Sequence, residues 1–553
     1  MKQVFTPRRG SALLAVAGCI AFLALSLHAA KLETPTVDEF AHVPAGCVYL
    51  RHGTFELFAK NPPLLKMLMA CAVLSNGDVV VPEPNDLSQG WGPWTYGLHF
   101  MAKNRPRYFD LFFSARLVVV LCGLGTGGLL FLWASQVFDR RSAAISCTLF
   151  LLTPVVLAHS HLATTDVGCM FTIFLSAYLL RCALVRPTWL RFVATGLAWG
   201  AALLVKFTAV LLAPAILILI LAVRWQNRGR AVLELGLVVV CALLIVNLGM
   251  GCQGSFQPLG NFDLQSSFCK SFQDHLPEWL PVPLPQPYLI GFDALKLDVE
   301  QGEFGGYLLG EWSQQGWWYY DLVAFAVKNP LPSLLLLAVC PWFLVRSDVV
   351  KPERLAFVVP LVVVLVLMIG FNRVQTGIRY LLPSMPFLYL ALTAIWSGLR
   401  GRWATWLPAT VMGWYVVTVA VTHPSYISYF NLAAGGETNG HRILAASNLD
   451  WGQDLYRLMP AVESLQREGA IGLLYFGHVH PGLYGIEYQL VPNRPVEGLL
   501  AVSVNYLLGS PYPAMTADGR MIPIEPDHLE WLRSHEPTLR LGSIWVFDTR
   551  NGQ

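Results

Sequence analysis

The sequence predicts an α-helical polytopic membrane protein with a small α/β domain at its C-terminal end. Of the 553 residues, 55% are hydrophobic and 13% are charged, whereas soluble globular domains carry about 25% charged residues. Eleven long apolar segments follow one another, and a tail of different composition comes after them. This pattern excludes a water-soluble globule and indicates a membrane domain joined to a folded domain outside the bilayer.

Each apolar segment approaches the length that a helix needs to cross a bilayer. A hydrocarbon core about 30 Å thick requires roughly 20 helical residues, because each residue rises about 1.5 Å. In chain order, the predicted spans are 11–30, 112–137, 142–159, 167–185, 189–205, 207–223, 231–250, 331–346, 355–371, 381–398 and 403–422.

The basic residues orient these spans, because Lys and Arg in short loops stay on the cytoplasmic side. If the N-terminus is inside, every cytoplasmic segment is basic. These residues are Lys2, Arg8, Arg9, Arg140, Arg141, Arg186, Arg191, Arg224, Arg228, Arg230, Arg346, Lys351, Arg354, Arg400 and Arg402. An odd number of spans then places the C-terminus outside an inner (plasma) membrane. Segment 11–30 could instead be a cleaved signal peptide, since "PRRG" precedes it and small residues end it, but the loop after it is outside in both cases.

Three external regions are long enough to carry chemistry: loops 31–111 and 251–330, and the tail. We expect a membrane domain over 1–422 and an extracytoplasmic domain over 423–553. In the tail, the β-type runs "IGLLYFG", "GLLAVSV" and "SIWVFDT" alternate with helix-like stretches "DLYRLMPAVESLQREG" and "PDHLEWLRSH". This alternation predicts an α/β fold.

Both external loops contain segments that suit the membrane surface. Pro62 and Pro63 favour the start of a helix in "NPPLLKMLMACAVL", which is too short to span the bilayer comfortably. The run "GWWYYDLVAFAVKNPLP" carries four aromatic residues suited to the headgroup zone. Cys252 and Cys269 share the second loop, so a disulfide between them is an open alternative.

Two adjacent carboxylates, Asp38 and Glu39, follow the first span within a few residues. By spacing alone, a solvated loop or the first turn of a helix explains them, because the helix dipole favours acidic residues there. Two neighbouring carboxylates can also divide labour, one taking a proton while the other orients a partner or binds a cation. Both interpretations stay open at this level.

A second group, "AHSHLATTDVG", forms a very short external turn that contains His159, His161 and Asp166. The two histidines could bind a metal, although this spacing on a turn is a weak signal. Asp166 is more informative, because a carboxylate at the head of a span is costly unless it is paired or faces water.

Several basic residues are predicted on the same outer side: Lys60, Lys66, Lys206, Lys328, Arg373 and Arg379. Each of them could be an interfacial residue whose stem lies along apolar surface. Together with external carboxylates, they indicate a site for an anionic, membrane-embedded ligand such as a lipid phosphate.

These motifs resemble a known group of enzymes. The segment "TVDEFAHVPAGCVYLRHGTFELFAKNPPLLKML" is similar to the first external loop of GT-C type glycosyltransferases that use polyprenyl-phosphate sugars. That group includes protein O-mannosyltransferases and the bacterial aminoarabinose transferases that modify lipid A. The likeness continues through "HLATTDVGCMFTIFLSAYLL", "GLAWGAALLVKFTAVLLAPA" and "GIRYLLPSMPFLYLAL", in the same order.

The resemblance implies roles for individual residues. It makes Asp38 the catalytic carboxylate and Asp166 a second functional carboxylate, and it places Lys206 near the donor phosphate. Arg379 also matches a pattern of the group. The tail departs from the sugar-binding modules of the eukaryotic members, which leaves the acceptor open as a protein, a lipid or a glycan.

The resulting hypothesis is transfer of a sugar from a polyprenyl phosphate to an acceptor hydroxyl on the extracytoplasmic side, with inversion. We expect Asp38 to act as the base and Glu39 and Asp166 to orient it or the acceptor. Lys206, Arg379 and Lys66 would stabilise the leaving phosphate. No nucleotide-binding loop and no required metal are expected, although Asp38, Glu39 and Asp166 could hold a divalent cation.

Two functions from other classes are alternatives. A transporter or lipid flippase should place its ionisable residues near the bilayer midplane, often in repeated halves, whereas here they gather at one face. A receptor or assembly factor would act through its tail, with Asp450, Trp451 and Asp454 of "SNLDWGQDLYRL" as a binding motif. Asn448 or Asp450 could equally cap a helix at that point.

Overall fold

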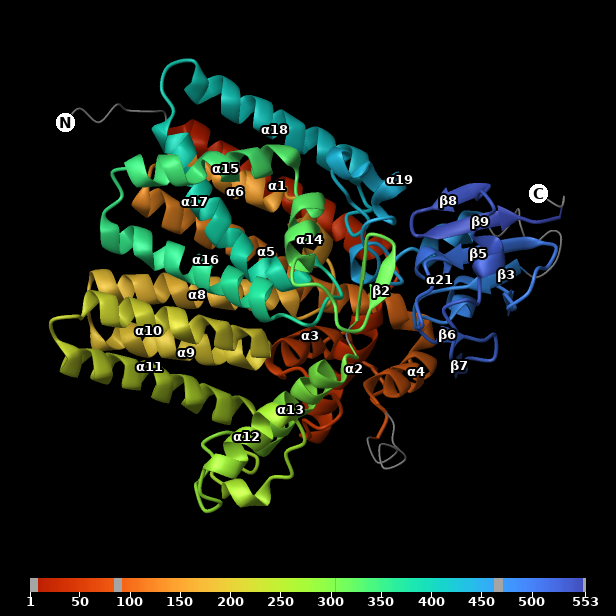
Figure 1. Ribbon diagram of the computed structural model, residues 1–553, viewed down its shortest axis with the longest axis horizontal. Coiled ribbons are helices and arrows are strands. Elements are labelled where there is room, and N and C mark those ends of the chain that lie inside the picture. The colour runs from red at the N-terminus through yellow and green to blue at the C-terminus, as the bar shows by residue number, and fades with distance from the viewer. Residues whose placement is uncertain (1–7, 84–91, 304, 462–470, 551–553) are drawn as a thin grey trace.

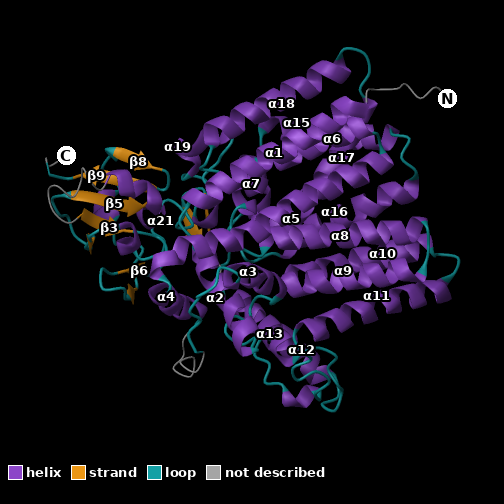
Figure 2. Ribbon diagram, turned by 180° about the vertical axis from the view of Figure 1, so that it is seen from behind, coloured by secondary structure: helices purple, strands orange, loops and turns teal. Residues whose placement is uncertain are grey.

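The computed structural model describes residues 8–83, 92–303, 305–461 and 471–550. Long helices lie side by side in a bundle, and a five-stranded sheet lies at one end of it (Figure 1; Figure 2). The start of α1 (Arg8–Leu32) and the α10–α11 and α15–α16 connections lie at the opposite end (Figure 1). We call the end next to the sheet, where α2 (Val37–His52) and α3 (Leu64–Leu74) pack, the site end.

All eleven predicted spans are helical. The bundle helices are α1 (Arg8–Leu32), α5 (Tyr108–Val137), α6 (Arg140–Leu151), α7 (Pro154–Ser160), α8 (Asp166–Val185), α9 (Trp189–Val205), η3 (Phe207–Leu211), α10 (Leu212–Val223), α11 (Arg228–Gly249), α15 (Leu331–Arg346), α16 (Lys351–Phe371), η5 (Ile378–Ser384), α17 (Met385–Gly398) and α18 (Trp403–Thr422). Among the described residues, seven helices are long and apolar enough to cross a membrane, or nine if two bent pairs count as spans. The predicted spans 189–205 and 207–223 are also apolar helices, but shorter.

The first loop returns to the site end in three helices, α2, α3 and α4 (Pro93–Lys103). Pro63 stands at the N-cap of α3, as the sequence predicted. However, α3 does not simply lie on a surface, because Leu65, Met69 and Val73 are buried and the helix packs against α2, α5 and α9. The core of the site end extends over α3, which an apolar run by itself does not reveal.

The second loop contains α12 (Ser267–His275), α13 (Gln286–Gln301), the short strands β1 (Gly306–Leu308) and β2 (Glu311–Ser313), and α14 (Tyr320–Lys328). Helix α14 meets α15 at an angle of 116°. Four aromatic residues, 317–320, were predicted to lie at the membrane surface. Of these, Trp318 is 70% exposed, whereas Tyr320 is buried. Cys252 and Cys269 are both free thiols, so this structure does not contain the disulfide that their shared loop allowed.

The tail forms the predicted α/β region around a mixed sheet. Its strands are β3 (Ile471–Leu474), β4 (Tyr488–Leu490), β5 (Leu499–Ser503), β8 (Leu539–Leu541) and β9 (Ile544–Asp548), in the order β4-β3-β5-β9-β8. Strand β3 pairs parallel with β4 and β5, and β9 pairs antiparallel with β5 and β8. The strands β6 (Ala514–Met515) and β7 (Met521–Ile522) form a separate pair.

Both faces of the sheet are covered, because successive strand residues point to opposite sides. Leu473 and Ala501 lie in a small core with Leu455, whereas Leu474 and Val502 belong to the main core that includes the bundle. The sheet is therefore packed onto the membrane helices rather than suspended on a linker.

One predicted helix in the tail is wrong. The stretch 526–535 forms turns with a single 3-10 segment, η11 (Glu530–Leu532). Leu529 and Leu532 are fully buried in this compact turn. Their tertiary contacts, rather than the local sequence pattern, therefore decide the conformation of the stretch. The other predicted helix begins as η8 (Leu455–Leu458), and its residues 462–469 lie outside the described residues.

Candidate functional site

A cavity of about 420 Å³ opens at the site end and contains residues from both external loops. Its polar lining includes Asp38, His42, Trp94, Lys206 and Arg379. Apolar residues of the bundle, Val210, Leu211, Leu367 and Met368, line another part of it. Helix α13 adds a further wall with Phe292 and Leu295. The cavity can therefore hold a molecule that is apolar at one end and polar at the other.

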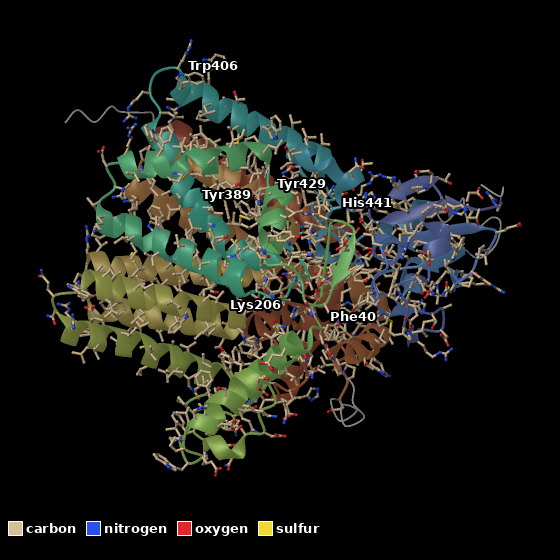
Figure 3. The ribbon with its side chains drawn as sticks, in the orientation of Figure 1. Phe40, Lys206, Tyr389, Trp406, Tyr429 and His441 are labelled. Atoms are coloured by element: carbon tan, nitrogen blue, oxygen red, sulfur yellow. The ribbon has the colours of Figure 1, made fainter. Side chains whose placement is uncertain are left out.

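Four charged side chains of alternating sign are linked here, and we call them the open cluster: Asp38, Arg379, Asp166 and Lys206. All except the buried Asp166 line the cavity. Arg379 Nη1 donates to Asp38 Oδ2 and lies 3.9 Å from Asp166 Oδ2. Lys206 Nζ donates to Asp166 Oδ1 at 2.5 Å. The ring of Tyr380 lies between the two cations, 4.6 Å from Lys206 Nζ and 5.4 Å from Arg379 Cζ. Figure 3 shows Lys206 at the end of the bundle that faces α2.

Helix ends place these four groups. Asp38 stands in the first turn of α2, which Thr36 and Glu39 begin as a capping box. Asp166 is the first residue of α8, where the helix dipole favours a carboxylate. Lys206 is the C-cap residue of α9, where the dipole favours a cation. Arg379 lies in the 3-10 turn η5 that precedes α17.

Glu39 is not part of this cavity, although it follows Asp38 directly. Its carboxylate is 0% exposed and accepts bonds from Arg116 Nε and Nη2, both at 2.7 Å, and from the backbone N–H groups of Thr36 and Ala163. Burial raises the pKa of a carboxylate, but the charge and hydrogen bonds of Arg116 outweigh it and hold the pKa of Glu39 below its ordinary value. This arrangement leaves Glu39 no face toward a substrate.

Arg116 uses all five of its N–H donors in that buried site. Besides Glu39, it donates to the carbonyl oxygens of Ala30 and Glu33 at 2.7 Å and of Thr34 at 3.2 Å. The end of α1, the start of α2 and the 163–166 turn are thereby joined through one guanidinium. His161 forms a further contact between the turn and the end of α1, because its Nε2 lies 2.8 Å from Glu33 Oε2.

Lys66 is likewise separated from the cavity. Its ammonium is fully buried and donates to the Tyr49 hydroxyl and to the carbonyl oxygens of Phe58 and Asn61, at 2.7 to 2.8 Å. Burial lowers the pKa of Lys66 well below its ordinary value. All three donors are satisfied by the protein, so the structure does not bring Lys66 to the other predicted phosphate ligands.

The other predicted basic residues divide between the cavity and the core. Lys60 and Arg373 line the cavity, and Lys60 Nζ lies 2.5 Å from Asp298 Oδ2 of α13. Lys328 is buried and donates to the carbonyl oxygens of Ile427 and Asn448. Lys60 and Arg373 therefore belong to the polar lining of the cavity, and Lys328 does not.

His42 is a cavity residue that the sequence analysis missed. It follows Asp38 by four residues, so both side chains lie on one face of α2. Its ring stacks on Phe58 with centroids 5.1 Å apart, and its buried Nδ1 has no hydrogen-bond partner among the described residues. Burial lowers the pKa of His42 to about 3, so the ring stays neutral at physiological pH. The i, i+4 spacing was the signal that could have found it.

Among the described residues, no group of three or more His, Cys, Asp or Glu side chains could hold a metal ion. His159 and His161 diverge: His161 reaches Glu33, while His159 packs against Trp451 with centroids 6.1 Å apart. Glu39 is separately engaged by Arg116. The donors suggested by the sequence for a divalent cation therefore do not converge.

Comparisons with known proteins agree with this architecture. Residues 109–249 match the family model described as dolichyl-phosphate-mannose-protein mannosyltransferase. No curated protein sequence matches the chain significantly. The crystal structure of ArnT from Cupriavidus metallidurans bound to undecaprenyl phosphate is similar at 13% identity with a TM-score of 0.51, and the match covers 98% of each chain.

A second similar structure is the oligosaccharyltransferase of Archaeoglobus fulgidus in complex with zinc and sulfate. It matches at 11% identity with a TM-score of 0.45, over 93% of this chain and 73% of that one. The match to ArnT shows that the two chains share a fold. It confirms the fold class predicted from the sequence, a GT-C type membrane protein with a C-terminal α/β region.

Proposed function

We propose that this protein is a membrane glycosyltransferase that moves a sugar from a polyprenyl-phosphate donor to an acceptor hydroxyl. The observation that carries the proposal is the cavity in which the Asp38 carboxylate stands beside Lys206 and Arg379, with apolar residues in the same lining. The family match over 109–249 supports the class of reaction. The shared fold supports the class of donor, because the similar ArnT structure contains undecaprenyl phosphate.

In this proposal the donor lies along the lining of the cavity. Its polyprenyl chain contacts Leu211, Leu367 and Met368, and its phosphate lies near Lys206 and Arg379. The sugar then occupies the polar part, between Asp38, His42 and Trp94. Such a donor needs no further activation, because the lipid phosphate is itself the leaving group.

Asp38 takes the proton of the acceptor hydroxyl as the hydroxyl oxygen attacks the anomeric carbon. The bond from that carbon to the phosphate oxygen breaks, and the negative charge that develops on the phosphate is stabilised by Lys206 and Arg379. Direct displacement inverts the anomeric centre. Asp166 touches both cations and keeps them in place, so its role is to orient the charges.

Arg379 has to change partners in this sequence. Without donor, it is paired with Asp38, and the four charges of the open cluster sum to zero. A phosphate next to Arg379 competes for the same guanidinium and releases Asp38 toward the acceptor. Binding of the donor and activation of the base are coupled through this one side chain.

We place the active site and the C-terminal region on the extracytoplasmic side of the inner membrane. The basic cytoplasmic segments support this orientation, because Lys and Arg in short connections are retained inside. The acceptor is a protein, lipid or glycan hydroxyl exposed on that side.

The test replaces Asp38 by Asn, which keeps the size of the side chain and removes the base. In cells that lack the native protein, Asp38→Asn should reduce the transferred sugar to background, a loss of at least about a hundredfold. Mass spectrometry of envelope glycolipids and glycoproteins measures it. Asp263→Asn, an exposed carboxylate in the second loop, is the matched control and should retain the wild-type pattern. Undiminished transfer by a stably expressed Asp38→Asn variant would refute the assignment of the base.

A further inference from the structure

A buried loop of the tail, residues 446–454, lies against both segments that carry the Asp38–Arg379 ion pair of the cavity. It contains "SNLDWGQD", a sequence that is compatible with a binding motif or with the start of a helix. Asn448, Asp450, Trp451, Gln453 and Asp454 are all at least 96% buried. Side chains so enclosed cannot recognise a partner from solvent, so the loop needs another explanation.

On one side, the loop holds the segment that leads into Asp38. The backbone N–H of Val37 donates to Trp451 O at 3.1 Å, and that of Thr34 donates to Gln453 O at 3.0 Å. The Tyr456 N–H donates to the Thr34 hydroxyl at 3.1 Å. The residue immediately before Asp38 is therefore fixed by the tail.

On the other side, the same loop holds the segment that carries Arg379. The Ile378 N–H donates to Asn448 Oδ1 at 3.0 Å, and Ser447 Oγ donates to the Thr376 carbonyl. Gly377 between them has no room for a side chain, because a Cβ atom there would collide with Ser447 Oγ. The indole of Trp451 lies over Arg379, with Cζ 4.5 Å from the ring centroid.

The sheet of the tail makes this loop rigid. The Ser543 N–H, directly before β9, donates to Asp454 Oδ2 at 2.9 Å, and Asn505 Nδ2 donates to Asp450 O at 2.8 Å. The Trp451 N–H is bonded to Gln453 Oε1 at 2.7 Å. Trp451 is thus presented by a loop that is bonded to the sheet of the tail.

We propose that Trp451 is a positioning residue that acts through Arg379, and that loop 446–454 makes the tail a component of the catalytic site. The indole covers one face of the guanidinium and so holds its Nη1 edge toward Asp38, Asp166 and the phosphate position. The tail thereby sets the geometry in which Arg379 passes from Asp38 to the donor phosphate. This inference rests on the proposed function.

The test measures the affinity of the full-length protein in detergent for undecaprenyl phosphate, with undecaprenol as the ligand that lacks the phosphate. Trp451→Leu should weaken binding of undecaprenyl phosphate about tenfold, and binding of undecaprenol should not change. Trp451→Phe, which keeps an aromatic face, should recover most of the affinity. The matched control is Trp545→Leu, since Trp545 also stacks on an arginine, Arg540, but within the sheet; it should bind as the wild type does.

A double-mutant cycle separates positioning from general damage. If Trp451 acts through Arg379, then Trp451→Leu should cause no further loss of affinity in an Arg379→Met background. Additive losses, or wild-type affinity in Trp451→Leu, would overturn the inference. Should the leucine variant fail to fold, Trp451→Met enters the same cycle.

Failure of the proposed function gives a different result. In that case the wild type would bind undecaprenol as well as undecaprenyl phosphate, and Arg379→Met would have no effect. If Arg379→Met weakens binding and Trp451→Leu does not, the site assignment survives and only the role of Trp451 is wrong.

Discussion

Two charge clusters lie next to each other at the site end, and they are built for opposite purposes. Three members of the open cluster, Asp38, Lys206 and Arg379, line a cavity, whereas a sealed cluster, consisting of Glu33, Glu39, Arg116 and His161, is almost completely buried. Asp38 and Glu39 are adjacent in sequence but belong to different clusters. In a helix of 3.6 residues per turn, neighbours point about 100° apart, so adjacency separates their side chains instead of bringing them together.

The comparison shows how one cluster supports the other. Through Glu39 and Arg116, the sealed cluster joins α1, α2, α5 and the turn before Asp166. That joint brings Asp166 close to Asp38 and allows Arg379 to reach both. The sealed cluster therefore contributes to stability, and the open cluster keeps polar groups available for chemistry.

The largest expected effect distinguishes the two adjacent carboxylates. Glu39→Gln leaves the Arg116 charge buried without its counter-charge, which should lower the free energy of unfolding by about 3–5 kcal/mol. Asp38→Asn should leave stability nearly unchanged, because Asp38 borders the cavity. Thermal unfolding of the purified variants measures both. An unchanged midpoint for Glu39→Gln, together with lost sugar transfer, would return Glu39 to the catalytic role predicted from sequence.

A second contrast tests the two lysines that were predicted to hold the donor phosphate. Lys206→Met should weaken binding of undecaprenyl phosphate about tenfold, since it removes a cation that lines the cavity. Lys66→Met should keep the affinity but lower the free energy of unfolding by about 2 kcal/mol, because buried carbonyl oxygens lose their donor. Equal losses of affinity in the two variants would mean that the cavity extends to Lys66 when the donor is bound.

The smallest effect concerns Asp450, a buried carboxylate that forms no ion pair with any described residue. Burial raises its pKa to about 7 from an ordinary value near 3.8. Below pH 4 the folded and unfolded chains both hold the proton, and as the pH rises the unfolded chain alone loses it, so stability falls. Asp450→Asn cannot ionise and should therefore gain about 1 kcal/mol over the wild type between pH 6 and pH 7. Parallel stability curves for the two proteins over this range would contradict the assignment.

Much of the fold could be predicted from the sequence, because apolar length and charge bias act locally. The helical character of the predicted spans, the start of α3 after Pro63 and the strands β3, β5 and β9 all follow from such signals. The turns at 526–535, where a helix was predicted, and the burial of one face of α3 against the bundle depend on tertiary contacts. Four of the predicted site residues lie together in the structure: Asp38, Asp166, Lys206 and Arg379. Two others, Glu39 and Lys66, are buried apart from them.

The sequence by itself determined the membrane class of this protein, its helices and the residue types available at one face of the bilayer. Hydrophobic length and the distribution of Lys and Arg are sufficient for that. Only the tertiary structure decided which charged side chains border the cavity and which are buried. This depends on contacts between residues far apart in the sequence: Arg116 and Glu39 are 77 residues apart, and Arg379 and Asp38 are 341 residues apart. It also decided that Trp451 of the tail lies on Arg379, a contact that no local pattern specifies.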